Sequence, residues 1–132
     1  LKTTLSDHTN SVFTVNYSGD GEVLISAGRD AHLMVWDVQA GYTQIQDIVA
    51  HMYAINNVEF SQDGKHFVTC SMDKSIKIWD AKAFKLLKVI DKARHAGHGT
   101  SVNKLLWSKY QNLLVSASDD RTISVWDIEF NM

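Results

Sequence analysis

The sequence predicts an all-β protein built from three copies of one unit, and three observations support this prediction. The dipeptide Trp-Asp occurs three times, about 43 and 47 residues apart. Each copy follows a short run of β-branched and aliphatic residues, which is typical of strands. Asp-Gly pairs separate such runs in the first two copies, and glycine there accepts the positive φ of a hairpin turn. An internal repeat of this length indicates four-stranded sheets arranged radially.

Three further residue types keep a fixed spacing to each Trp. A His, a Ser or Thr, and an Asp precede every Trp at the same intervals in all three copies. The three sets are His8, Ser26, Asp30 and Trp36; His51, Thr69, Asp73 and Trp79; and His98, Ser116, Asp120 and Trp126. Agreement at several positions at once, three times over, predicts one segment, 1–132, with repeats at about 1–37, 38–80 and 81–127.

Each repeat is expected to hold strands a, b and c before its Trp-Asp pair, followed by an outer strand d. Strand d of the first two repeats is predicted at residues 43–49 and 84–90. The third repeat stops just after strand c, whereas residues 1–5 precede the first His, where a strand d belongs. The order along the chain is therefore d-a-b-c, three times, and residues 1–5 must pair with a strand c that lacks a partner.

These residues and spacings closely resemble the Trp-Asp (WD) repeat family of β-propellers over nearly the whole chain. The resemblance implies three four-stranded antiparallel blades, in which the His, the hydroxyl residue, the Asp and the Trp of each repeat form a buried, structural, hydrogen-bonded tetrad. One departure concerns the turn between strands a and b. The family usually carries Ser-Pro-Asp-Gly there, whereas this chain has Gly19 and Gln62 at the proline position and no proline at all. We expect Gly19 to loosen its turn, because glycine loses more entropy on ordering.

Three blades are too few to close a ring, since natural propellers have about four to eight. An open arc exposes a sheet face and unpaired strand edges, both of which favour association. We therefore expect the chain to pair with itself, as a homodimer in which each chain is half of a six-bladed ring. A homotrimer is the alternative. The competing interpretation is that the chain is a fragment of a longer propeller.

The recurrence of Ser, His and Asp requires a hydrolase triad to be considered. No Gly-x-Ser-x-Gly elbow surrounds Ser26, Thr69 or Ser116, and three identical triads in one small domain would be unusual. We therefore predict no catalytic residues. His95 and His98 lie three residues apart, but no further Cys or His cluster completes a tetrahedral metal site. Neither a metal nor a cofactor is expected.

Bulk properties narrow the range of partners and locations. The 132 residues carry a net charge of -2, which gives no electrostatic reason to expect nucleic acid or an anionic membrane. No apolar stretch is long enough to span a bilayer. Cys70 is the only cysteine, so no internal disulfide forms, and a reducing, cytoplasmic location is expected.

The resemblance implies a non-catalytic scaffold for protein–protein interaction. Propellers of the family usually bind a protein or peptide on the face formed by the d–a and b–c loops. The residues expected on that face are Asn10, Arg29, Met52, Tyr53, Met72, Lys74, Thr100, Asp119 and Arg121. Two alternatives stay open: an engineered or fragmentary propeller with a purely structural or assembly role and no ligand, and a hydrolase.

Overall fold

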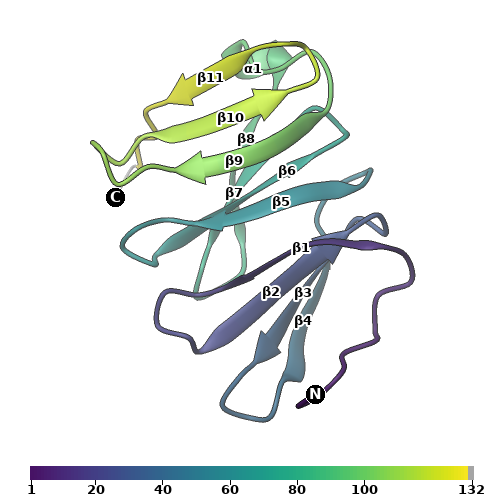
Figure 1. Ribbon diagram of the computed structural model, residues 1–132. Coiled ribbons are helices and arrows are strands. Elements are labelled where there is room, and N and C mark those ends of the chain that lie inside the picture. Colours follow the sequence, from purple (N-terminus) through teal and green to yellow (C-terminus); the bar gives the residue numbers. More distant parts are fainter. Residues whose placement is uncertain (131–132) are drawn as a thin grey trace.

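The computed structural model describes residues 1–130 and contains three antiparallel sheets that follow one another along the chain (Figure 1). The first sheet holds β1 (Val12–Tyr17), β2 (Val23–Gly28), β3 (His32–Asp37) and β4 (Thr43–Val49), in that order. The second holds β5 (Ile55–Phe60), β6 (His66–Ser71), β7 (Ile76–Asp80) and β8 (Leu86–Ile90). The third holds β9 (Val102–Trp107), β10 (Leu114–Ser118) and β11 (Ile123–Trp126). The predicted all-β fold of propeller blades is confirmed.

The blades meet along their first strands. Figure 1 shows β1, β5 and β9 following one another across the molecule, with β4 and β8 at the far side of their sheets. The side-chain amide of Asn16 on β1 donates to the backbone carbonyl of Val58 on β5 at 3.2 Å, and the side-chain Oδ1 of Asn57 accepts the Leu105 N–H of β9 at 2.8 Å. These bonds between side chain and backbone fix neighbouring inner strands against each other.

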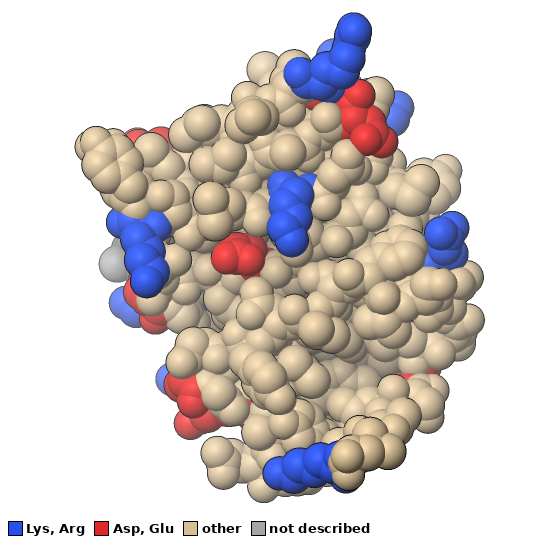
Figure 2. Space-filling view, in the orientation of Figure 1, with Lys and Arg blue, Asp and Glu red and all other residues tan. Residues whose placement is uncertain are grey.

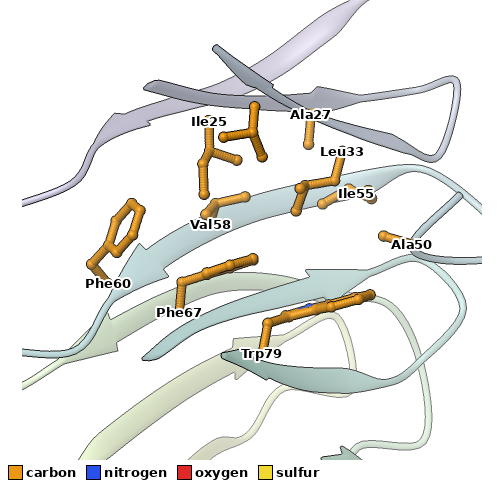
Figure 3. Close-up of a cluster of buried hydrophobic side chains, with 10 residues drawn as sticks. Ile25, Ala27, Leu33, Ala50, Ile55, Val58, Phe60, Phe67 and Trp79 are labelled. Atoms are coloured by element: carbon orange, nitrogen blue, oxygen red, sulfur yellow. The ribbon is translucent and has the colours of Figure 1, made fainter. Parts of the chain in front are cut away.

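Two apolar clusters fill the spaces between the blades. Figure 3 shows the first, in which side chains of the first blade point toward those of the second. From the first blade come Ile25, Ala27, Leu33 and Val35, and from the second Ile55, Val58, Phe60, Phe67 and Trp79. The second cluster joins Val68, Cys70, Ile76 and Ile78 to Val102, Leu105, Trp107 and Leu114. Each fully buried aliphatic side chain contributes about 1.5–3 kcal/mol, so blade stacking is the main source of stability.

The turns between strands a and b follow the predicted pattern. Gly21 and Gly64 have φ values of 73° and 72°, the left-handed region that glycine enters without steric cost. The third turn differs, as its sequence suggested, because Gln111 and Asn112 adopt positive φ values of 52° and 55°. The Asp before each glycine holds its turn: Asp20 accepts the Ser18 hydroxyl, and Asp63 accepts that of Ser61.

The structure departs from the sequence-based expectation at three places. Within the described residues the third sheet has three strands rather than four, and residues 1–5 form no strand. Figure 1 shows why: the N-terminus lies beside the first blade, far from the free edge of β11. The second outer strand begins at Leu86 rather than at residue 84, because Phe84 has a φ of 55° and packs on the first cluster. The inserted loop contains one helical turn, α1 (Lys92–His95).

Candidate functional site

The structure brings together the four side chains of each predicted tetrad. His Nδ1 lies 2.8, 2.8 and 2.9 Å from an Asp oxygen in the pairs His8 and Asp30, His51 and Asp73, and His98 and Asp120. His Nε2 lies 2.7 Å from the hydroxyl oxygen of Ser26, Thr69 and Ser116, respectively. The indole N–H groups of Trp36, Trp79 and Trp126 donate to the same oxygens at 3.0, 3.0 and 2.9 Å. We call each chain of four groups a relay.

Only one arrangement of protons satisfies every group in a relay. The indole can only donate and the ionised Asp can only accept. The hydroxyl therefore accepts from Trp and donates to His Nε2, and His donates through Nδ1–H to the Asp. A neutral His with its proton on Nδ1 meets these demands. Each relay thus joins strand c, strand b, the b–c turn and the preceding loop by one continuous path.

The Asp of each relay also holds the backbone of the loop before strand a. Asp30, Asp73 and Asp120 accept the N–H of the residue after the His at 3.1, 3.3 and 3.2 Å. A backbone bond adds a second tie between the same two segments in each blade. It runs from Arg29 N–H to the Ser11 carbonyl, from Met72 N–H to the Ala54 carbonyl, and from Asp119 N–H to the Ser101 carbonyl. The same loop geometry is therefore built three times.

Two further residues belong to the relays and were missed by the sequence analysis. The Ser75 hydroxyl donates to Asp73 at 2.6 Å and lies 3.2 Å from His51 Nδ1. Thr122 makes the matching contacts to Asp120 and His98. The first blade has His32 at this position, and His32 instead contacts Asp47 at 2.6 Å on the outer side of the sheet. The signal was a hydroxyl residue two positions after Asp in two of the three repeats.

Burial and hydrogen bonding act in opposite directions on the relay carboxylates. Burial raises the pKa of Asp73, but hydrogen bonds from His51 and Ser75 together hold it well below its ordinary range. The pKa of Asp30 is also lowered, because the His8 bond and two backbone N–H groups outweigh its burial. The hydrogen bond from the Thr122 hydroxyl is the main reason that the pKa of Asp120 is lowered. Burial lowers the pKa of His51, which favours its neutral form.

The predicted partner-binding residues lie in the loops that the relays hold. Met52, Tyr53 and Met72 are strongly exposed, at 83%, 61% and 50%. The Arg29 guanidinium lies over the Phe13 ring, 5.3 Å from its centroid, which restrains its orientation. Lys74 and Arg121 hold the same position in their turns, with φ values of 76° and 70°.

The other three predicted residues make local hydrogen bonds. Asn10 accepts the Ser11 N–H, and Asp119 accepts from the Asn103 amide at 2.6 Å. The Thr100 hydroxyl lies 3.2 Å from that of Ser118. We name all nine residues the loop surface: Asn10, Arg29, Met52, Tyr53, Met72, Lys74, Thr100, Asp119 and Arg121.

The relay hydroxyl groups and the Cys70 thiol, which could act as nucleophiles, are buried. The exposed fractions of Ser26, Thr69 and Ser116 are 5%, 0% and 1%. Burial raises the pKa of the Cys70 thiol to about 12, so it is protonated and unreactive at neutral pH.

The two histidines that lie three residues apart in the sequence differ in their surroundings. His98 belongs to its relay, while His95 is exposed at the end of α1. Across residues 1–130, no three His, Cys, Asp or Glu side chains cluster as metal ligands would, and no helix is long and apolar enough to cross a membrane.

A family comparison agrees with this repeated geometry. The model described as "WD domain, G-beta repeat" matches three stretches, residues 1–37, 42–80 and 87–127. The chain belongs to the WD40 repeat family. Each matched stretch ends at the Asp that directly follows the Trp of a relay.

Two curated WD40 relatives align with nearly the whole chain. Protein HIR1 of Kluyveromyces lactis is 29% identical over 138 residues, which cover 93% of this chain and 15% of HIR1. Small ribosomal subunit protein RACK1 of Brassica napus is 31% identical over 139 residues, which cover 97% of this chain and 42% of RACK1. The chain thus spans less than half the length of either relative.

Proposed function

We propose that the chain is a non-catalytic scaffold that binds a protein or peptide through its loop surface. The observation that carries this proposal is that the loop backbone is held by hydrogen bonds while large side chains on the same loops are exposed. The relays fix the loop backbone in all three blades, while Met52, Tyr53 and Met72 remain exposed. Aromatic and Arg side chains are favoured at binding hot spots, and Met adapts to irregular partner surfaces. Membership of the WD40 family and the two relatives support the same role.

The geometry of the relays supports the non-catalytic part of the proposal. A serine-type nucleophile must reach a substrate carbonyl, and its base must be free to take the proton. Here each hydroxyl is buried and also accepts an indole N–H. The alternatives of a hydrolase or of a purely structural assembly without a ligand are outcomes of the tests below.

The experiment on the loop surface compares variants in affinity capture of partners from a cell extract. We expect one defined partner to be retained by the wild-type chain and lost with Tyr53→Ala or Arg121→Glu. Lys109→Ala is the matched control, because Lys109 is exposed in the a–b turn at the opposite end of the third blade. A partner that is lost equally with Lys109→Ala, or kept by both loop variants, would contradict the assignment.

We further propose that two copies associate head to tail. The positions that bury the interfaces between blades recur, with exposed or partly exposed side chains, at the two ends of the arc. On the third blade the residues matching Ile25, Ala27, Leu33 and Val35 are Val115, Ala117, Ile123 and Val125, which we call the leading face. On the first blade the residues matching Ile55, Val58, Phe60 and Phe67 are Val12, Val15, Tyr17 and Leu24, which we call the trailing face.

Exposure of these two faces is the argument for a second copy. Ile123 and Val125 are 72% and 61% exposed, and Val15 and Tyr17 are 62% and 51% exposed. Their counterparts inside the chain are almost fully buried. Each copy carries both faces, so two copies meet at two equivalent seams and make six blades. Residues 1–5 of one copy would then pair with the free edge of β11 in the other, supplying the missing fourth strand.

Light scattering coupled to size exclusion tests this association. We expect a mass of twice 14.9 kDa for the wild-type chain and a shift toward 14.9 kDa for Ile123→Lys with Val125→Lys. Tyr53→Ala serves as a control that should keep the wild-type mass. A wild-type mass of 14.9 kDa at high concentration would overturn self-association, and three times that mass would favour the homotrimer.

The charges favour a protein partner over nucleic acid or a membrane surface. Figure 2 shows Lys and Arg side chains scattered singly over the face it displays, beside Asp and Glu, without a basic patch. The net charge is -2. A cytoplasmic location is part of the proposal and rests on Cys70 being the only cysteine.

A further inference from the structure

A cleft of about 550 Å³ opens between the first and second blades, at the end of the sheets opposite the loop surface. Its walls come from the a–b turns of both blades and from the chain that follows β7. Val23, Phe60 and Ala81 form an apolar floor that adjoins the first core cluster. The charged residues Glu22, Lys65 and Lys82 stand at the rim. We call this site the lower cleft.

The corresponding space between the second and third blades is filled by the chain itself. Matched by their distance from the Trp of each repeat, Phe60, Ala81 and Ala83 correspond to Trp107, Ile128 and Phe130. All three replacements are larger. Ile128 and Phe130 pack against the second core cluster. The lower cleft is therefore open because Phe60 and Ala81, which line it, are smaller than Trp107 and Ile128.

Phe130 shows that the corresponding space between the second and third blades holds an aromatic side chain. Its ring stacks on His66 with centroids 3.8 Å apart and planes 7° from parallel. His66 holds the position that Val23 holds in the first blade. The segment after β11 thus lays an aromatic side chain across the strand that borders the cleft, and Lys88 Nζ lies 3.4 Å from its Glu129 carbonyl. An aromatic side chain from another molecule could lie on Val23 in the same way.

Free charged groups at the rim indicate which residues should flank the aromatic residue in a bound segment. Asp20 and Asp80 are committed to their own turns: Asp20 accepts the Ser18 hydroxyl, and Asp80 accepts the N–H groups of Lys82 and Ala83. Within residues 1–130, the side chains of Glu22, Lys65 and Lys82 have no hydrogen-bond or ion-pair partner. The wall from the first blade therefore presents a free carboxylate, and the wall from the second presents two free ammonium groups.

We propose that the lower cleft binds an extended segment of a partner protein that carries an aromatic residue between a basic and an acidic residue. The aromatic side chain enters between the blades and lies on Val23, Phe60 and Ala81. The basic neighbour pairs with Glu22, and the acidic neighbour pairs with Lys65 and Lys82. Both walls belong to one chain, so this site does not depend on self-association or on the loop surface.

Nuclear magnetic resonance of the ¹⁵N-labelled chain tests the proposal with a synthetic probe, N-acetyl-Gly-Lys-Phe-Glu-Gly-amide. We expect saturable shifts of the backbone amides of Val23, Lys65 and Ala81. A probe with Gly in place of Phe should bind at least tenfold more weakly. The double variant Ala81→Ile with Ala83→Phe, which copies the filled space of the third blade, should lose the saturable shifts while keeping the dispersed spectrum of a folded chain.

Charge variants separate the lower cleft from nonspecific peptide binding. Lys82→Glu should weaken the probe at least threefold, and Lys109→Glu, at an exposed site on the third blade, should leave the affinity unchanged. The proposal is overturned if the wild-type chain shows no saturable shifts at the three amides, or if the filled double variant binds the probe as well as the wild type does.

Discussion

The Nδ1 atom of His51 lies 2.8 Å from a carboxylate oxygen of Asp73, and that carboxylate also accepts the Met52 N–H at 3.3 Å. One residue pair therefore orients the loop and connects it, through Thr69, to the indole at the blade core. We propose that this relay, repeated in each blade, is the structural unit that keeps the loop surface in place.

Replacing Asp73 with Ala should destabilise the chain by about 1–3 kcal/mol, because buried donors of His51 and Ser75 lose their acceptor. Urea unfolding followed by tryptophan fluorescence measures the change. Asp47→Ala is the matched control, since its pair with His32 is exposed, with side-chain fractions of 35% and 42%, and should cost less than about 0.5 kcal/mol. Equal losses in the two variants would contradict a structural role for the relay.

Acid should destabilise the chain in two stages. The folded-state pKa of His51 is lowered by burial, so the unfolded chain binds the proton first, and stability falls as the pH drops below about 6.5. The folded-state pKa of Asp73 is also below its ordinary value, so its contribution is present above about pH 3.9 and is lost below that. Urea midpoints at several pH values should decline steadily from pH 7 to pH 3. A midpoint that rises between pH 7 and pH 5 would show the wrong sign for His51.

Fluorophosphonate probes should not label the native chain at Ser26 or Ser116, since both hydroxyls are buried and already hydrogen-bonded. Cys70 should resist a thiol reagent in the same way until the chain unfolds, because it is fully buried and its pKa is raised to about 12. Mass spectrometry of the native and urea-unfolded protein provides the comparison. Rapid labelling of a native serine would revive the hydrolase interpretation.

Two glycines of the first blade should respond in opposite directions to substitution. A Cβ atom on Gly28 would lie 2.1 Å from the Ser11 carbonyl oxygen, so Gly28→Ala should cost about 1–3 kcal/mol through forced backbone movement. Gly19 has nothing within 4 Å of its Cβ position, and Gly19→Pro should add about 0.4–1 kcal/mol by restricting the unfolded chain. Thermal unfolding distinguishes them. A destabilising proline would indicate that the Gly19 backbone cannot accept its ring.

Most of the fold could be predicted from the sequence because each strand lies at a nearly constant distance from the Trp of its repeat. The outer strand at residues 43–49 was predicted to the residue, since Thr43–Val49 is bounded by clear turn signals. The start of β8 was misplaced because Phe84 is apolar yet serves as a turn residue with positive φ. A strand at residues 1–5 depends on an edge that is not within reach in the same chain, so no local pattern could determine it.

The site was only partly accessible from sequence. The relay residues could be named from the resemblance, but their protons and the backbone ties follow from distances alone. Ser75 was not recognised because the first repeat has His32 in its place. The lower cleft was invisible at that stage, since it depends on how Ala81 and Ile128 differ in volume once the blades are stacked.

The backbone ties between Arg29 and Ser11, Met72 and Ala54, and Asp119 and Ser101 involve no side-chain atoms. Any residue type except proline, which lacks a backbone N–H, can therefore donate these bonds from positions 29, 72 and 119. The loop side chains of one blade can therefore be substituted, and its binding specificity changed, without changing the fold or the neighbouring blades. A designer could likewise diversify residues 29, 72 and 119 as a library on a fixed frame.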